Sequence, residues 1–442
     1  MKNLKSNIFF KIGIIIVITL ILLIPTALVQ ELIHERENVQ EQAIEEVSSK
    51  WGNGQTITGP FVSVPYDKFI KRTLTDSTSE IVTLKKWAHF LPEQLNIEGK
   101  VAPEKRYRGI FEVVVYESVL SLNGSFNQFD FDQLEVESKN VHFDQATFNV
   151  GVSDLRGIET QVSLNWNNKA SLFNPSTSTN DLVKSGINAN IKIDKDDSLN
   201  YEFNVELDLK GSQHLYFVPV GKITDINIAS DWSTPSFTGE YLPDTRTINN
   251  SGFTANWNIL HLNRNYPQSW TGSQHNVSYS SFGTDLLLPV DGYKKSHRVA
   301  RYSILFIVLT FLVFFFVEIM NKVFIHPIQY LLVGIALVVF YSLLLSFSEH
   351  ILFNFSYILA AVLTLFLVTG YTMAILKSKT LSLLILGILT ILYTFIFIII
   401  QMEDYALLIG SIGIFIILGI VMFFSRKIDW YDIKIGKEET NN

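Results

Sequence analysis

Charge is almost missing from the C-terminal third of this 442-residue chain. Residues 302–425 contain seven formal charges: Glu318, Lys322, Glu349, Lys377, Lys379, Glu403 and Asp404. These charges separate five apolar stretches, residues 302–317, 327–347, 351–376, 380–402 and 405–425. Each stretch is about as long as a helix must be to cross the roughly 30 Å hydrocarbon core of a bilayer. The sequence therefore predicts five membrane-spanning helices in this third of the chain.

A sixth apolar stretch lies near the N-terminus. Residues 12–29 are uncharged, and Lys2, Lys5 and Lys11 precede them. As a helix they would be about 27 Å long. A cleaved signal peptide is the alternative, but its apolar region is usually shorter, and Pro25-Thr26-Ala27-Leu28 is a poor cleavage site. We therefore expect a first span that stays in the protein.

The basic residues predict how the six spans are oriented. With six spans, both termini lie on one side, together with Lys2, Lys5, Lys11, Lys322, Lys377, Lys379, Arg426 and Lys427. The short loops on the other side contain Glu349, His350, Glu403 and Asp404 and no Lys or Arg. Since basic loops stay in the cytoplasm, we expect cytoplasmic termini and residues 30–301 outside. The predicted parts are 1–29 (N-terminus and first span), 30–50 (stalk), 51–301 (outer domain), 302–425 (bundle) and 426–442 (cytoplasmic tail).

One basic cluster does not follow this pattern. Lys294, Lys295, Arg298 and Arg301 lie just before the second span, on the outer side. Long domains cross the membrane largely regardless of their charge, so the predicted orientation stands. These residues either anchor a helix end by reaching toward the interface, which is the commoner arrangement, or bind anionic lipid headgroups.

The middle of the chain changes from a helical to a strand period. Residues 30–50 are charged and lack Gly and Pro, which predicts a helical stalk that ends at Trp51-Gly52. Beyond it, apolar and polar residues alternate strictly, most clearly over residues 187–193, 199–210 and 253–259. Such alternation indicates strands with one buried and one wet face. We expect an all-β, antiparallel sandwich-like domain, which is long enough to form two modules split near residues 171–180.

Composition excludes several classes of function. Residues 30–301 contain 25 basic and 34 acidic residues, and a net-acidic domain argues against nucleic acid as a partner. The chain has no Cys, which excludes disulfides, thiol catalysis and iron–sulfur clusters. The nine His lack metal-ligand spacing, and there is no P-loop, dinucleotide-binding fingerprint or G-x-S-x-G motif. We therefore predict no catalytic residues, no cofactor and no metal site.

Four residues of the outer domain are candidates for a recognition surface. Arg106 and Arg108 flank a predicted strand, where two arginines could bind a carboxylate or phosphate. Pairing with acidic neighbours is the commoner role for such arginines. His261 and Arg264 follow another predicted strand, and loops after strands often carry recognition. For His261, an ordinary loop or interface histidine is the commoner role, and a general base is the rarer one.

Four polar residues of the membrane region are candidates because an ionisable group inside a membrane is a functional hypothesis by default. Glu318 and His326 lie near one end of the second and third spans, and Glu349 and His350 lie near the opposite surface. All four map to span ends, where water and headgroups relieve a charge. We expect interfacial capping, with Glu318 and His326 organising the inner face of the bundle.

Several stretches of the chain carry a family resemblance: Arg106-Tyr107-Arg108-Gly109, Asp154-Leu155-Arg156-Gly157, residues 232–268, residues 285–293 and residues 326–332. In these stretches and in their order, the chain resembles the CreD family of inner-membrane cell envelope integrity proteins. The resemblance implies a bacterial inner-membrane protein linked to envelope integrity and stress response. It implies no reaction and no catalytic residues.

These observations predict a non-enzymatic, multi-pass inner-membrane protein that acts through a periplasmic β domain. Its expected partners are membrane lipids and an unidentified envelope protein or cell-wall component. A transporter or channel subunit is an alternative, although the spans lack a charge at mid-bilayer. A membrane enzyme acting on lipid or cell-wall precursors is a further alternative, and it would need a polar cleft lined by converging groups.

Overall fold

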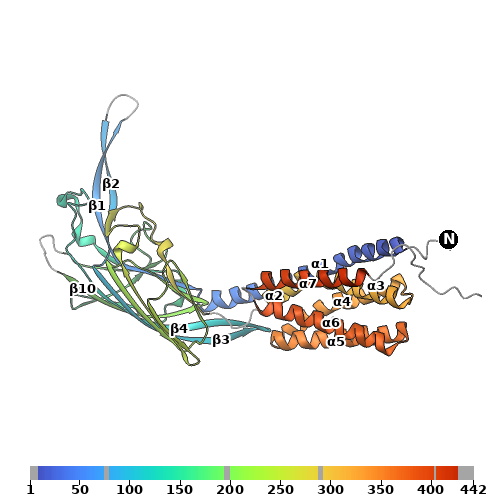
Figure 1. Cartoon of the computed structure of the whole chain (residues 1–442). Helices are drawn as coiled ribbons and strands as arrows, with labels where there is room; N and C mark the ends of the chain where they lie inside the picture. The colour runs from blue at the N-terminus through green and yellow to red at the C-terminus, as the bar shows by residue number, and fades with distance from the viewer. Residues whose placement is uncertain (1–7, 74–78, 194–199, 287–291, 403–404, 427–442) are drawn as a thin grey trace, which may run out of the picture. The chain divides into compact units, whose positions relative to one another are not determined.

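The computed structural model describes residues 8–73, 79–193, 200–286, 292–402 and 405–426. The chain divides into two compact units (Figure 1). We call Met1–Gln40 with Val290–Asn442 the helical unit, and Glu41–Pro289 the β unit. Helix α1 (Ile8–Trp51) contributes its first part to the helical unit and its last part to the β unit.

The helical unit confirms the six predicted spans. Six helices in the described residues are long and apolar enough to cross a membrane. They are α1, α3 (Ser303–Asn321), α4 (Pro327–Ser348), α5 (Phe353–Leu376), α6 (Lys379–Gln401) and α7 (Ala406–Ser425). The bounds differ from the prediction mainly at the start of α1 and the end of α3, which extend far enough to include Lys11 and Glu318. Both of these residues were expected just outside a span.

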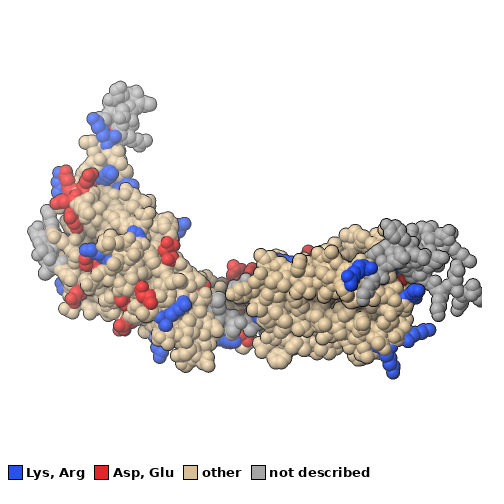
Figure 2. All heavy atoms as spheres, viewed as in Figure 1, with Lys and Arg blue, Asp and Glu red and all other residues tan. Residues whose placement is uncertain are grey.

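The outer surface of the helical unit is apolar. Figure 2 shows few charged side chains along the visible sides of its helices. Large side chains such as Phe366, Leu407 and Phe415 are at least three-quarters exposed. Exposed apolar side chains on this scale fit helices surrounded by lipid.

Inside the helical unit, a glycine lets α1 approach α4 closely. A Cβ atom added to Gly334 of α4 would lie 2.2 Å from Leu22 Cδ1 and 3.0 Å from Phe311 Cζ. Leu22 is almost fully buried, although α1 is otherwise largely exposed. Small residues at helix contacts serve this purpose in membranes, where van der Waals packing drives association.

A short helix, α2 (Gly292–Arg301), carries the basic cluster before the second span. Tyr293, Ser296, Val299 and Ala300 form its buried face. Lys295 donates to the side-chain oxygen of Gln401 at 3.4 Å. Because α2 belongs to the helical unit, the boundary predicted at residue 301 moves to about residue 290.

The β unit consists of two sheets. The nine-stranded sheet A has the order β13-β17-β11-β1-β5-β9-β8, with β2 beside β1 and β16 beside β2. The eight-stranded sheet B has the order β14-β15-β12-β3-β4-β10-β6-β7. Sheet A contains β1 (Gln55–Thr73), β2 (Ser79–Phe90), β5 (Thr147–Val152), β8 (Asn174–Pro175), β9 (Gly186–Asn190), β11 (His214–Val218), β13 (Pro235–Gly239), β16 (Ser269–Thr271) and β17 (Phe282–Leu286). Sheet B contains β3 (Gln94–Arg108), β4 (Phe111–Phe126), β6 (Ser163–Trp166), β7 (Lys169–Leu172), β10 (Tyr201–Ser212), β12 (Ile223–Ser230), β14 (Thr245–Asn249) and β15 (Gly252–Leu260).

Two details of this arrangement correct the sequence analysis. Each sheet includes one parallel pair, β1 with β11 and β3 with β12, so the sheets are mixed rather than purely antiparallel. Strands from both sides of residues 171–180 also enter both sheets, since β5 pairs with β9 and β6 pairs with β10. The β unit is therefore one body and not two modules.

The predicted alternation decides which side chains form the core. On β10, Tyr201, Phe203, Val205, Leu207 and Leu209 are buried, and the residues between them face outward. Residues of both sheets join one buried cluster, in which the Phe126 ring lies 6.0 Å from Phe148 and 5.5 Å from Phe203. The start of the alternating run, at residue 199, lies outside the described residues.

The predicted stalk helix is confirmed, and it ends where expected. Trp51 is its last residue, and Gly52 follows with a φ of +155°. A Cβ atom on Gly52 would lie 2.8 Å from the Lys210 carbonyl oxygen, so glycine suits this exit. The Trp51 ring lies 4.6 Å from the Arg106 guanidinium and 4.4 Å from Lys210 Nζ, both contacts within the β unit.

Candidate functional site

A row of five asparagines and one aspartate crosses the outer face of sheet B. On six neighbouring strands, the directly opposed residues are Asn or Asp: Asn258 (β15), Asp225 (β12), Asn96 (β3), Asn123 (β4), Asn204 (β10) and Asn165 (β6). We call this set the amide row. Its five steps of about 4.8 Å give it a length of roughly 24 Å.

The amide row faces solvent because its members alternate with core residues. Asn96 lies between Leu95 and Ile97, which are both fully buried. Asn96, Asn165 and Asn258 are exposed, and the other three members are half-buried. Each asparagine offers two N–H donors and a carbonyl acceptor, so the row presents closely spaced groups of both kinds.

Hydrogen bonds hold part of the amide row in place. Asn204 donates to the Asn123 side-chain oxygen, and Asn123 donates to Ser121 Oγ at 3.0 Å. Asp225 accepts from Asn258 at 3.1 Å and from Asn227 at 3.0 Å. These bonds position some row members in advance, while the Asn96 side chain has no hydrogen-bond partner among the described residues.

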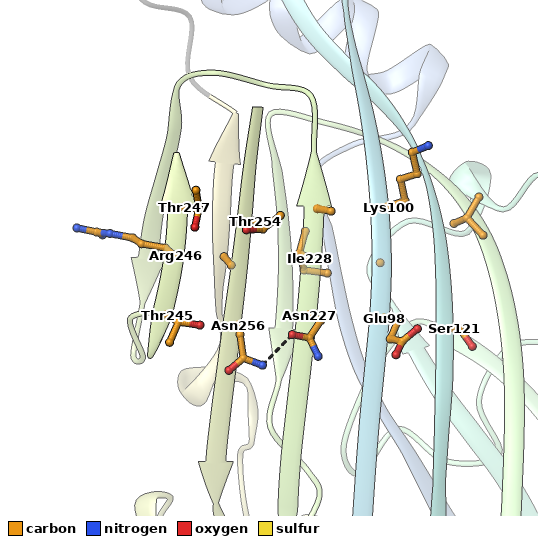
Figure 3. Close-up of a pocket in the computed structure, with 14 residues that line it drawn as sticks. Glu98, Lys100, Ser121, Asn227, Ile228, Thr245, Arg246, Thr247, Thr254 and Asn256 are labelled. Carbon is orange, nitrogen blue, oxygen red and sulfur yellow. Dashed lines mark hydrogen bonds between the residues drawn. The ribbon is translucent and has the colours of Figure 1, made fainter. Parts of the chain in front are cut away.

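Two hollows of this face lie along the amide row. The larger, of about 770 Å³, covers β14, β15, β12, β3 and β4 (Figure 3). Its outward-facing lining includes Glu98, Lys100, Ser121, Asn227, Thr245, Arg246, Thr247, Thr254 and Asn256. Figure 3 shows these side chains side by side across the strands, with Asn256 donating to Asn227 at 2.8 Å.

The smaller hollow, of about 390 Å³, contains members of the amide row itself. Asn123, Asn165 and Asn204 line it, together with Gln94, Ser125, Asn168, Asn200 and Glu202. The smaller hollow is therefore lined mainly by neutral hydrogen-bonding groups. The larger hollow combines such groups with the charged Glu98, Lys100 and Arg246 and with apolar residues such as Val119 and Ile228, and it lies beside the row. Closely spaced donors and acceptors of this kind suit ligands rich in hydroxyl and amide groups.

A second site lies inside the helical unit, where Lys11 of α1 pairs with Glu318 of α3. Glu318 is fully buried and Lys11 is 7% exposed. Glu318 also accepts from the Tyr330 hydroxyl at 2.9 Å and from the Ile325 backbone N–H at 3.1 Å. Lys11 donates in addition to the Ile325 carbonyl at 2.9 Å. The pair thus joins α1, α3, the segment after α3 and α4.

This environment corrects the expectation of an interfacial Glu318. Its charge is balanced by Lys11 and by hydrogen bonds from the Tyr330 hydroxyl and the Ile325 backbone N–H, and not by water. The expectation that Glu318 lies on the inner face of the bundle agrees with its full burial. Lys11, interpreted from the sequence as a flanking residue, is the partner that the sequence analysis missed.

The other three membrane residues occupy helix ends. The exposed His326 is the N-cap of α4, where its Nδ1 accepts from the Ile328 N–H at 3.3 Å. Glu349 accepts from the Tyr293 hydroxyl at 3.1 Å and lies 3.7 Å from Arg36 Nε. His350 is exposed at the turn after α4. These placements fit capping and turn formation, and they do not bring His326 to the inner face.

The predicted recognition residues Arg106 and Arg108 pair with acidic neighbours. Arg106 Nε donates to Glu104 at 2.6 Å, and Arg108 Nε donates to Glu46 at 2.9 Å. Both arginines remain about half exposed. The contacts of both arginines therefore agree with local ion pairing to acidic neighbours, the commoner of the two roles considered for them.

Arg264 does not line a surface. Its side chain is buried, and its guanidinium donates to the carbonyls of Tyr266 at 2.7 Å and Val220 at 3.1 Å. Burial lowers the pKa of Arg264 from its usual value. Arg264 therefore holds neighbouring loops together through their backbone carbonyls. Its role is structural, and the predicted role in recognition is wrong. His261 is half exposed and begins a short turn.

The four predicted recognition residues also do not form one surface. Leu260, beside His261, pairs with Ile223 of β12, and Ile223 pairs with Gln94 at the start of β3. Arg106 lies twelve positions further along β3, which is about 40 Å at roughly 3.3 Å per residue. The two pairs therefore lie at opposite ends of sheet B.

A Ser–His–Asp arrangement, which the sequence did not indicate, is buried in the β unit. His89 Nε2 lies 3.1 Å from Asp181 Oδ2, and its Nδ1 lies 3.0 Å from Ser63 Oγ. Because a carboxylate only accepts, Nε2 carries the proton and Nδ1 accepts from the serine. Ser63 and His89 are fully buried, so neither contacts solvent in this conformation. Among the described residues, no group of three or more His, Cys, Asp and Glu side chains could hold a metal ion.

The buried ion pair gives a first prediction. Replacing Lys11 with Met leaves the Glu318 charge buried and unpaired, and we expect a loss of about 3–5 kcal/mol in the free energy of unfolding. The double variant Lys11→Met/Glu318→Leu removes both charges and should recover most of that loss. Unfolding of the full chain in mixed detergent micelles measures both values.

Lys50→Met is the matched control, because Lys50 lies on the same helix and also forms an ion pair, with Glu46, but its side chain is exposed. Its expected cost is below about 1 kcal/mol. A double variant as unstable as Lys11→Met would contradict the proposed role of the pair.

A second prediction concerns pH. Burial lowers the pKa of His89 below its usual 6.5, although Asp181 opposes the shift, and burial also lowers the pKa of His214. Below 6.5 the unfolded chain therefore binds more protons than the folded chain, and the free energy of unfolding should fall between about pH 7 and pH 5.5. The expected fall is up to about 1 kcal/mol per histidine. Thermal unfolding of His89→Asn at both pH values should show a smaller fall than wild type, and an equal fall would refute the assignment.

Comparison with known proteins identifies the family to which this chain is similar. The family model described as "Inner membrane protein CreD" matches residues 7–431. The Inner membrane protein CreD of Escherichia coli (strain K12) is 30% identical over 440 residues, which cover 98% of this chain and 96% of that protein.

The solved structures that align with this chain resemble it only weakly. An M1 zinc metallopeptidase from Deinococcus radiodurans aligns with a TM-score of 0.19 and 8% identity, over 38% of each chain. A mutant of that peptidase bound to a Tyr-Ser-Ala substrate aligns with a TM-score of 0.18 and 8% identity, over 38% of this chain and 39% of that one. Scores at this level do not establish a common fold. The match over nearly the whole length, together with the six apolar helices, shows that this chain belongs to the CreD family of inner-membrane proteins.

Proposed function

We propose that this protein supports the integrity of the bacterial cell envelope without catalysing a reaction. In this proposal the β unit lies in the periplasm, and its amide row binds a cell-wall component rich in hydroxyl and amide groups, such as a glycan strand. The observation that carries the proposal is the alignment of five carboxamides and one carboxylate across six strands of one exposed face.

The ends of the helices support the periplasmic placement. Lys322 follows α3, Lys377 follows α5, Lys379 begins α6 and Arg426 follows α7, all at one set of helix ends. At the opposite ends, the turn after α4 contains Glu349 and His350. Since basic residues favour the cytoplasmic side, the β unit, inserted between the first and second spans, is expected on the other side.

The chemistry of the amide row supports a neutral, polar ligand. Five of its six members are uncharged, and each of these five offers donors as well as acceptors. The one charged member of the row, Asp225, is acidic and disfavours a strongly anionic ligand there, while the neighbouring hollow carries both signs of charge, on Glu98, Lys100 and Arg246. A glycan strand presents hydroxyl and acetamido groups at close, regular intervals, which such a row can pair with.

The orientation gives a third prediction, which the absence of cysteine makes simple to test. A single cysteine at Asn250, in the exposed turn between β14 and β15, should react with a membrane-impermeant maleimide in cells whose outer membrane has been permeabilised. A cysteine at Thr380, beside Lys379 at the start of α6, should react only after the inner membrane is lysed. The reverse pattern would overturn the periplasmic placement.

The amide row gives a fourth prediction. The full chain in mild detergent should sediment with purified peptidoglycan sacculi. The double variant Asn96→Thr/Asn165→Thr removes two exposed members and keeps good strand formers. Two hydrogen bonds of about 1 kcal/mol each correspond to roughly a thirtyfold loss of affinity.

The matched control is Asn174→Thr/Asn190→Thr, the same change at two exposed positions of sheet A. It should bind sacculi as wild type does. In a strain lacking the gene, wild type, this control and Ser63→Ala should all restore detergent resistance, whereas the amide-row variant should not. Sacculi that bind none of the proteins, or equally bind the row variant, would overturn the assigned ligand, and a requirement for Ser63 would favour an enzyme.

A further inference from the structure

The β1–β2 hairpin extends beyond the two sheets as an arm (Figure 1). We define the arm as residues 67–71 of β1 and 80–86 of β2, which pair from Asp67 with Lys85 to Lys71 with Ile81. Among the described residues, β1 pairs with β5 as far as Ser63, and β2 pairs with β16 as far as Ala88. The backbone ladder of the arm therefore joins only its own two strands, while the side chains of Asp67 and Lys85 at its base contact His142 and Gln145.

The arm exposes large apolar side chains on both of its faces. Phe69 and Ile81 lie on one face and are 56% and 71% exposed. Ile70 and Leu84 lie on the other face and are each 39% exposed. Soluble surfaces rarely group such residues, and where they do, the patch usually marks an interaction site.

The arm is also basic, although it belongs to an acidic domain. Lys68, Lys71, Lys85 and Lys86 are exposed along it, against a single exposed acidic residue, Glu80. Blue side chains follow the arm in Figure 2. Register places two of these lysines on each face, beside the apolar pairs.

We propose that the arm docks on the surface of an anionic phospholipid bilayer. Apolar side chains on both faces of a ribbon suit an environment that surrounds it, since acyl chains and headgroups can contact both faces. A protein partner would more simply cover one face. Lysines beside the apolar residues complement anionic headgroups, and each lysine near such a surface raises the affinity by about fivefold. This contact does not depend on the glycan proposed for the amide row.

A fluorescent label on the arm tests the proposal. The full-length Ile81→Cys variant carries one cysteine, which an environment-sensitive dye can label, and the protein is placed in phosphatidylcholine nanodiscs. Adding vesicles that contain phosphatidylglycerol, or including that lipid in the nanodisc, should shift the dye emission to the blue. Phosphatidylcholine alone should not do so.

Two variants serve as controls. A dye at Asn250→Cys, on a turn of sheet B, should show no shift with either lipid. Adding Lys68→Gln and Lys71→Gln to the labelled arm should weaken the vesicle response by about 25-fold.

Three results would overturn the proposal. They are no shift with anionic lipid, an equal shift with phosphatidylcholine, and a shift that appears on raising the protein concentration without anionic lipid. The last result would indicate contact between two copies of the chain instead.

Discussion

A lysine and a glutamate that lie 307 residues apart hold the N-terminal helix to the remaining spans. The other buried side chains of α1 within the helical unit are mostly apolar, and apolar contacts gain little when lipid is the alternative neighbour. The Lys11–Glu318 pair is different, because separating it would leave two charges in an environment of low dielectric constant. Gly334 then lets α1 approach closely enough for Leu22 to be buried against α4. The pair specifies where α1 docks, and the glycine makes that docking possible.

The spans, the stalk helix and the burial pattern of the strands could be predicted because they depend on residues near each other in sequence. An apolar run of sufficient length can only cross a membrane or be buried, and strict alternation leaves one face of a strand wet. The outward positions of Asn204, Asn256 and Asn258 follow from that alternation. That Asn204 and Asn258 belong to one transverse row was not predictable, because the row depends on strand order and register across residues 96–258.

The same limit explains the predictions that were wrong. Lys11 looked like a flanking charge because its partner is on α3, and nothing near either residue in sequence indicates the other. Arg264 looked like a loop residue available for recognition because the carbonyls that it satisfies belong to Val220 and to its own loop. Arg106 and His261 looked like parts of one surface, but the parallel pairing of β3 with β12 places them at opposite ends of sheet B. A site assembled by tertiary contacts leaves little trace in local patterns.

The amide row has a consequence for folding that is separate from any ligand. A slip of one residue between two strands would turn core side chains outward, so hydrophobic burial already disfavours it. A slip of two residues keeps every side chain on its proper face, and burial alone distinguishes it poorly from the native pairing. Such a slip of β10 against β4 would place Asn204 opposite Ser121 or Ser125 and would break its bond with Asn123. The hydrogen bonds from Asn204 to Asn123 and from Asn258 to Asp225 therefore favour the native register of the strands that they join.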